Sequence, residues 1–172
     1  MVRTGSTDRE NREQPNRDTG LAAGQETCWT LIQAAADGDG GARDLFASTY
    51  APVVQAYLGA RWRSHRLAQE IADATQEVFV ECCKDSGVLH AASPTRGSFR
   101  GFLFGVVRNV AHRYEHRVAQ SYARRPEDSV ELGEVIHETD GLSTVFDRAW
   151  AQALMTEAAQ LHAQRAAQDE AA

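Results

Sequence analysis

The spacing of the apolar residues is the feature that most constrains this chain. Large apolar side chains recur every three or four residues, the period of an α-helix that buries one face. The stretches with this period cover residues 28–36, 42–62, 67–85, 99–119 and 142–167. No strongly alternating run of β-branched residues accompanies them, and glycine and proline are scarce. The sequence therefore predicts an all-α protein.

The third and fourth stretches have the clearest two-sided pattern. On 67–85 the apolar face is Leu67, Ile71, Val78, Phe79 and Cys82, with Glu70, Asp73, Gln76, Glu77 and Glu81 mostly turned away. On 99–119 it is Phe99, Phe102, Leu103, Val106, Val110 and Tyr114, with Arg108, Asn109, His112 and His116 opposite. Pro52 interrupts the second stretch, so we expect a kink there or the start of a new helix.

Composition divides the chain into four parts. Residues 1–26 are polar, which predicts a disordered tail. A helical domain is expected at 27–120, followed by an acidic linker at 121–140 that contains Pro126 and Gly133. One long helix falls within 141–172, and no later helix follows to cover its apolar stripe.

The charges are segregated along the sequence. The net charge is −6, but residues 90–125 hold seven arginines and one acid, Glu115. Residues 126–172 hold two arginines and ten acids. A basic block before an acidic one suggests a surface for polyanions and another that avoids or imitates them. Ordinary solvated helix faces would give the same pattern.

The cysteines favour a reduced, cytoplasmic protein. There are three, at positions 28, 82 and 83, and neighbouring cysteines on one helix cannot easily bridge. The N-terminus lacks the apolar core of a secretion signal, and no apolar run approaches the roughly 20 residues of a membrane span. Cys82, Cys83 and His90 lack zinc-site spacing, so we expect no metal and a core position for Cys82.

Catalytic motifs are not found. The chain has no phosphate-binding loop and no Gly-x-Ser-x-Gly nucleophile motif. His112 and His116 lie one helical turn apart, but without the glutamate of a His-Glu-x-x-His site. We therefore expect neither an enzyme nor a cofactor.

Nucleic-acid binding is better supported. The fourth stretch combines arginine, asparagine and histidine on one face, with Arg113 and Arg117 beside it. Phe99, Phe102 and Phe104 lie just upstream, and single-stranded binding sites combine a basic path with stacking surfaces. Phe99 and Phe102 also fit a core position; Phe104 fits it less well.

Three collinear segments resemble the extracytoplasmic-function sigma factors of bacterial RNA polymerase. Residues 73–80, with their Asp-x-x-Gln-Glu-x-Phe pattern, resemble the part of region 2 that contacts the polymerase. Residues 99–109, Phe-Arg-Gly-Phe-Leu-Phe-Gly-Val-Val-Arg-Asn, resemble the promoter-melting part. Residues 31–52 are similar to the family's opening segment, and 142–167 to the first helix of region 4.

The resemblance implies a sigma region 2 bundle, an acidic linker and one long C-terminal helix. It implies docking on the clamp helices of the largest polymerase subunit through Asp73, Gln76, Glu77 and Val80. It also implies capture of the unpaired minus-ten promoter strand by the loop around 93–100 and the helix after it. The matching positions are Ser98, Arg100, Phe102, Arg108, Asn109, His112, Arg113 and Arg117. An anti-sigma protein is a further partner that the resemblance allows.

Two departures limit this expectation. Phe102 stands where the family has tryptophan, and the helix-turn-helix of region 4 has no counterpart before Ala172. We therefore expect docking and melting without recognition of a whole promoter. The alternative is a non-catalytic interaction module that associates through Trp150, Leu154 and Leu161.

Overall fold

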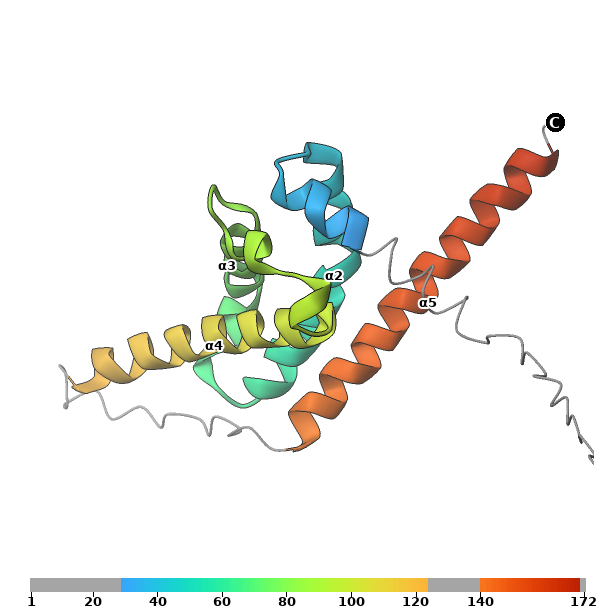
Figure 1. Ribbon diagram of the computed structural model, residues 1–172. Coiled ribbons are helices and arrows are strands. Elements are labelled where there is room, and N and C mark those ends of the chain that lie inside the picture. Colours follow the sequence, from blue (N-terminus) through green and yellow to red (C-terminus); the bar gives the residue numbers. More distant parts are fainter. Residues whose placement is uncertain (1–28, 124–139, 171–172) are drawn as a thin grey trace, which may run out of the picture.

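The fold is built of helices throughout the part that can be described. The computed structural model describes residues 29–123 and 140–170, so the expected tail and most of the expected linker lie outside it. Helical residues 29–36 are followed by α2 (Gly40–Arg61), α3 (Ile71–Cys83), α4 (Phe99–Ala123) and α5 (Asp140–Glu170) (Figure 1). The all-α prediction is confirmed.

A side-chain cap starts α2. The carboxylate of Asp39 accepts a hydrogen bond from the backbone N–H of Ala42 at 2.6 Å, which satisfies a donor that the first helical turn leaves unpaired. The helix then continues to Arg61 with Pro52 inside it, so a new helix does not begin at the proline. Pro52 and Ser48, whose carbonyl loses its helical partner, are both exposed to solvent, which limits the cost of the missing bond.

The connection from α2 to α3 includes a 3₁₀ turn where the sequence predicted the start of an α-helix. Arg66–Glu70 form a short 3₁₀ helix, and α3 itself begins only at Ile71. The imidazole Nδ1 of buried His65 accepts a hydrogen bond from the Leu67 N–H at 3.1 Å and caps this turn. Burial lowers the pKa of His65, which suits an acceptor nitrogen.

Gly87 makes the turn after α3 possible. A Cβ atom at this position would lie 2.4 Å from the carbonyl oxygen of Cys82 and 2.6 Å from that of Lys84. The preceding residue, Ser86, has a positive φ of 59°, a conformation that few side chains adopt without cost. Two 3₁₀ turns, Val88–Ala91 and Pro94–Arg96, then lead into α4.

One core joins all the helices. The predicted apolar faces point into it: Val78, Leu103 and Val110 are buried, and so is Cys82. Burial raises the pKa of the Cys82 thiol to about 12, so this cysteine is a packing residue without nucleophilic character. The largest fully buried side chains in the described part are Trp62, Arg61, Tyr50, Tyr57, Phe46 and Phe146.

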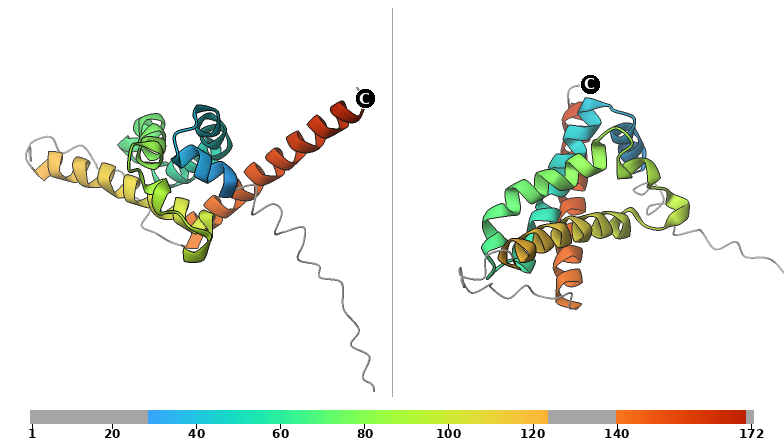
Figure 2. Two further views of the ribbon diagram at one scale, coloured as in Figure 1. Left: turned by 45° about the horizontal axis from the view of Figure 1, so that its top comes forward. Right: turned by 90° about the vertical axis from the view of Figure 1, so that its left-hand side faces the viewer.

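The first turns of α5 belong to this core, contrary to the expectation that the last helix lies outside the domain. Leu142, Phe146 and Ala149 are buried, and α5 crosses α2 (Figures 1 and 2). The Phe146 ring lies 5.1 Å from that of Phe104, and Trp150 stacks on Tyr50 at 4.9 Å. The remainder of α5 projects away from the bundle, leaving Met155, Leu154 and Leu161 exposed.

We expect Phe146→Ala to lower the free energy of unfolding by about 3–5 kcal/mol, because it removes a fully buried ring and leaves a cavity between three helices. Urea denaturation followed by circular dichroism measures the effect. Met155→Ala, at a position 72% exposed on the same helix, is the matched control and should change stability by less than about 0.5 kcal/mol. Equal stabilities for the two variants would contradict the docking of α5.

Candidate partner and nucleic-acid interface

A buried ion pair holds α4, which carries most of the predicted nucleic-acid residues, against α2. Arg61 is 1% exposed, and its Nε and Nη2 atoms donate to the two carboxylate oxygens of Glu115 at 2.6 and 3.1 Å. The indole Nε1 of Trp62 donates to the same carboxylate at 2.9 Å, and Arg61 Nη1 donates to the Tyr57 hydroxyl at 3.0 Å. The bidentate contact fixes both the height and the rotation of α4 on α2.

The hydrogen bonds that Glu115 accepts lower its pKa by more than burial raises it. Burial alone would raise the pKa of this carboxyl, but the donors of Arg61 and Trp62 hold it below its usual value. The sequence identified Glu115 only as the single acid of the basic block and gave no sign of this role. Its i−3 neighbour His112, which carries a predicted DNA contact, lies 3.4 Å away.

The exposed face of α3 carries the predicted polymerase-binding residues. Asp73, Gln76 and Val80 are exposed, and Val80 is 53% exposed although it is apolar. Glu77 differs from the other three because it is half-buried and paired within the chain. Three of the four residues are therefore available to a partner from the same side of one helix.

Glu77 links the α3 face to α4. Its carboxylate accepts hydrogen bonds from Arg113 at 2.8 Å and from Arg117 at 3.1 Å, and Arg113 also lies 3.4 Å from Glu81. Burial would raise the pKa of Glu77, but the bonds from Arg117 and Tyr114 lower it. The two sets of residues that the sequence assigned to different partners thus meet at one carboxylate.

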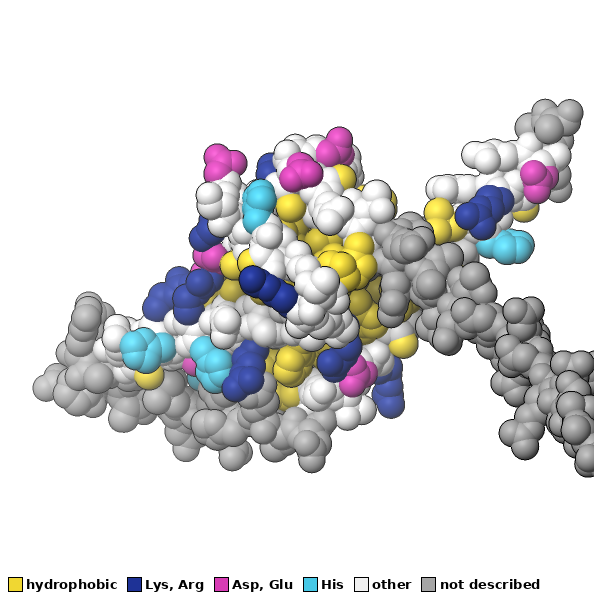
Figure 3. Space-filling model, in the orientation of Figure 1, with side chains coloured by type: hydrophobic (Ala, Val, Ile, Leu, Met, Phe, Trp, Pro, Cys, Tyr) yellow, Lys and Arg dark blue, Asp and Glu magenta, His cyan; other side chains and the backbone are white. Residues whose placement is uncertain are grey.

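The basic face of α4 is solvent-exposed. Arg108, Asn109 and His112 are all exposed, as are Arg113 and Arg117. Figure 3 shows Lys, Arg and His side chains distributed along α4, with some acidic side chains beside them and others at the top of this view. Cations of the basic block therefore lie on an exposed face of one helix.

The predicted residues at the start of α4 have structural tasks as well. The Ser98 hydroxyl accepts a hydrogen bond from the Gly101 N–H at 3.2 Å and so caps the helix. Phe102 is half-buried and stacks on Phe99, with ring centroids 5.7 Å apart. Phe104, which fits the core less well by its position in the sequence, packs edge-on against Tyr57 of α2, and Phe146 of α5 covers its other side.

Arg100 is held by α5. Its Nε donates to the carboxylate of Asp147, and its Nη2 donates to the Ser143 hydroxyl at 3.3 Å. The guanidinium also lies 5.6 Å from the ring centre of Phe104 and 5.5 Å from that of Phe146. The sequence placed Arg100 next to DNA and carried no signal for this contact, because Asp147 is 47 residues away.

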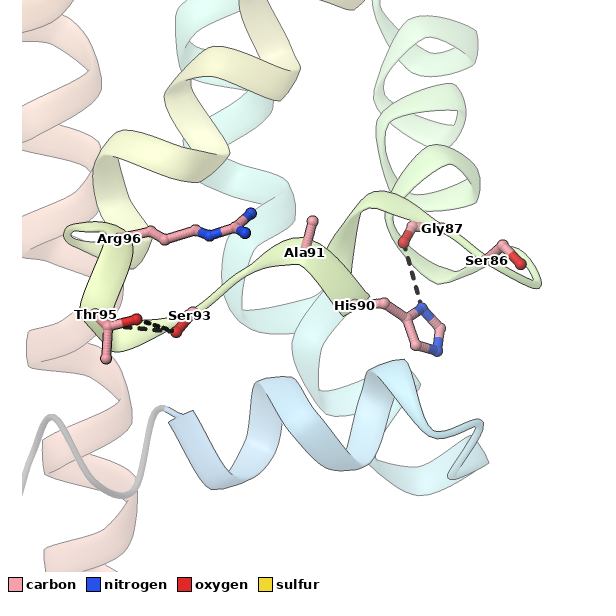
Figure 4. A pocket seen from close by; sticks show the side chains of 7 residues that line it. All are labelled: Ser86, Gly87, His90, Ala91, Ser93, Thr95 and Arg96. Carbon is pink, nitrogen blue, oxygen red and sulfur yellow. Dashed lines mark hydrogen bonds between the residues drawn. The ribbon is translucent and has the colours of Figure 1, made fainter.

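An open pocket of about 770 Å³ lies in the loop between α3 and α4. Its lining is polar and cationic: Ser86, Gly87, His90, Ala91, Ser93, Thr95 and Arg96. Ser93 and Thr95 hydrogen-bond to each other at 2.8 Å at one end, and the Arg96 side chain extends towards Ala91 (Figure 4). His90 lies at the other end, against the Gly87 carbonyl. The pocket therefore has hydroxyl, imidazole and guanidinium groups on its rim, of which the two hydroxyls and the imidazole already have partners within the loop.

Other kinds of site gain no support. Among residues 29–123 and 140–170, no three His, Cys, Asp or Glu side chains are grouped to hold a metal ion. Within the same ranges no helix is long and apolar enough to cross a membrane. Trp150, a residue of the alternative self-association surface, is stacked inside the fold, whereas Leu154 and Leu161 remain exposed.

No protein-family model matches the chain, and neither curated proteins nor solved structures gave a significant match.

Glu115→Gln should destabilise the fold by about 3–5 kcal/mol near neutral pH, because it leaves the buried Arg61 without a counter-charge. The folded-state pKa of Glu115 lies below its ordinary value of 4.5. The stabilisation is therefore complete above pH 4.5 and is lost as the pH falls through the folded-state pKa. Urea unfolding of both proteins from pH 7 to pH 3 should show the difference between them shrinking; a pH-independent difference would contradict this account.

Proposed function

We propose that the chain is a bacterial sigma factor of the extracytoplasmic-function class that docks on RNA polymerase through α3 and captures the melted minus-ten strand with α4 and the loop before it. The observation that carries the proposal is the meeting of two surfaces of different chemistry at Glu77. One is the exposed acidic and amide face of α3, and the other is the arginine, asparagine and histidine face of α4.

The α3 face has the composition of a docking surface. An exposed valine flanked by a carboxylate and an amide gives an apolar contact with a polar rim, as found in protein interfaces. Asp73 attracts a partner rich in lysine and arginine, such as the clamp helices that the family resemblance implies. The half-buried Glu77 contributes mainly by holding α4 beside this face.

The loop and α4 have the composition of a single-strand site. Arg108 and Asn109 lie where a phosphate backbone would pass, and the pocket lined by Ser93, Thr95 and Arg96 is open to an unstacked base. Phe102, whose half-buried ring stacks on Phe99, stands at the position of the tryptophan of the family and would offer a base a smaller ring. The absence of enzymatic activity remains part of this proposal.

Docking is tested with core RNA polymerase and the full chain carrying Asp73→Lys or Val80→Asp. Asp73→Lys puts a positive charge opposite a basic partner, and Val80→Asp puts a carboxylate into the apolar contact, where it would lose water without gaining a counter-charge in place of the valine. Each should weaken binding at least about tenfold if its residue is a hot spot of the interface. Size-exclusion co-elution and a pull-down titration measure the binding. Glu77→Lys is less informative, because it also repels Arg113 and Arg117 within the chain.

Asp44→Lys is the matched control for docking, since it makes the same charge change at an exposed residue of α2. It should bind core polymerase as the unmodified chain does. If the chain and all three variants fail to bind polymerase, the sigma-factor proposal is wrong. Self-association that is abolished by Leu161→Asp would then favour the interaction module.

Strand capture is tested with a fluorescent single-stranded oligonucleotide and the chain assembled with core polymerase. Arg108→Gln and Arg96→Gln should each weaken binding, because each removes a cation from the proposed path. The slope of log affinity against log salt should fall by about 0.7 for each phosphate that is no longer neutralised. Arg63→Gln, in the exposed turn after α2, is the control and should change neither quantity. Stronger binding to the same sequence as a duplex would contradict the single-strand assignment.

A further inference from the structure

Arg100, a residue that the proposed function assigns to DNA binding, is hydrogen-bonded to α5 in this structure. All of the hydrogen bonds described for the Arg100 guanidinium go to α5, to the carboxylate of Asp147 and the hydroxyl of Ser143. A phosphate diester could take the place of this carboxylate and this hydroxyl. Its oxygens accept hydrogen bonds from the N–H groups of a guanidinium, as the oxygens of Asp147 and Ser143 do.

The contact is built so that the arginine can change partner. The Arg100 side chain is 31% exposed and that of Asp147 is 52% exposed, so water screens the pair and its net stability is small. The rings of Phe104 and Phe146 lie beside the guanidinium and keep its long side chain at the surface of α4. A phosphate can therefore approach from solvent without first opening the core.

The helix that carries Asp147 does not have to leave. Phe146 and Ala149, the residues around it on the inner face of α5, are buried in the shared core. Only the exposed carboxylate needs to lose its partner, while α5 keeps its position on α2.

We propose that Asp147 is an internal substitute for a DNA phosphate: it holds Arg100 in the free protein and competes with single-stranded DNA for that arginine. The inference rests on the proposed function, because it takes α4 to be a nucleic-acid surface. Its consequence is that α5 lowers the affinity of the free protein for polyanions. Arg113 and Arg117, further along α4, are held in the same way by Glu77 of α3. Arginines of α4 are therefore paired with a carboxylate of a neighbouring helix at two places.

The test compares four forms of the full chain at physiological salt: unmodified, Asp147→Asn, Arg100→Gln and the double variant. Fluorescence anisotropy measures their affinity for one single-stranded oligonucleotide. Asp147→Asn should bind about two- to fivefold more tightly, the range that a screened ion pair supports. Arg100→Gln should bind more weakly than the unmodified chain, and adding Asp147→Asn to it should bring no gain, because the effect acts through Arg100.

Two controls separate this competition from a general charge effect. Asp169→Asn removes the same charge from an exposed position near the far end of α5 and should leave the affinity unchanged, because salt screens distant charges. Ser143→Ala removes the weaker of the two partners of Arg100 and should give a smaller gain than Asp147→Asn. Thermal melts confirm that each variant is folded before affinities are compared.

The outcomes distinguish this inference from the proposed function. Equal affinity of the unmodified chain and Asp147→Asn, with normal binding to core polymerase, overturns the competition alone. An equal gain in the Arg100→Gln background overturns it as well, since the carboxylate then acts without the arginine. If no form of the free chain binds single-stranded DNA, the competition is overturned, whereas strand capture by the complex with core polymerase is decided by the separate oligonucleotide titration of that complex.

Discussion

The ion pair between Arg61 and Glu115 is the contact on which the arrangement of the surface depends. It joins the end of α2 to α4 at a place where Arg61 is buried and Glu115 is largely shielded from water. Such a pair adds little to stability compared with an apolar substitute, but it is satisfied in only one relative position of the helices. The ion pair therefore fixes the direction of the side chains on the exposed face of α4.

Aromatic packing does the complementary task on the other side of the bundle. A continuous set of ring contacts joins α2, α4 and α5. It is formed by Tyr50 and Tyr57 of α2, Phe99 and Phe104 of α4, and Phe146 and Trp150 of α5. Apolar contacts of this kind supply most of the favourable free energy but tolerate small shifts. The polar pair and the rings together give a helix that is both strongly held and precisely oriented.

The sequence was sufficient where the information was local. The periodic apolar residues predicted each described α-helix within a few residues and assigned Val78, Cys82 and Leu103 to the core, but they gave no sign of the 3₁₀ turns at Val88–Ala91 and Pro94–Arg96. It was insufficient where two distant segments meet: the burial of Phe146, the contact of Asp147 with Arg100 and the partner of Glu115 all span more than 40 residues. A helical pattern shows that a face is apolar, but it does not show which helix will cover it, so α5 was expected outside the domain. The packing of the helices determines which residues are exposed, and the partner that an exposed residue binds depends on chemistry outside the core.

Gly87 has a consequence for how this surface can vary among related or engineered chains. Some residues of the loop after it also set its backbone: the Ser93 hydroxyl accepts a hydrogen bond from the Thr95 N–H at 3.3 Å and caps the second 3₁₀ turn, and Gly97 has a positive φ of 132°. The turn that introduces the loop has no room for a single additional carbon atom, since two carbonyl oxygens already occupy that space. Chains that vary the pocket side chains of His90 and Arg96 should therefore stay folded far more often than chains that replace Gly87.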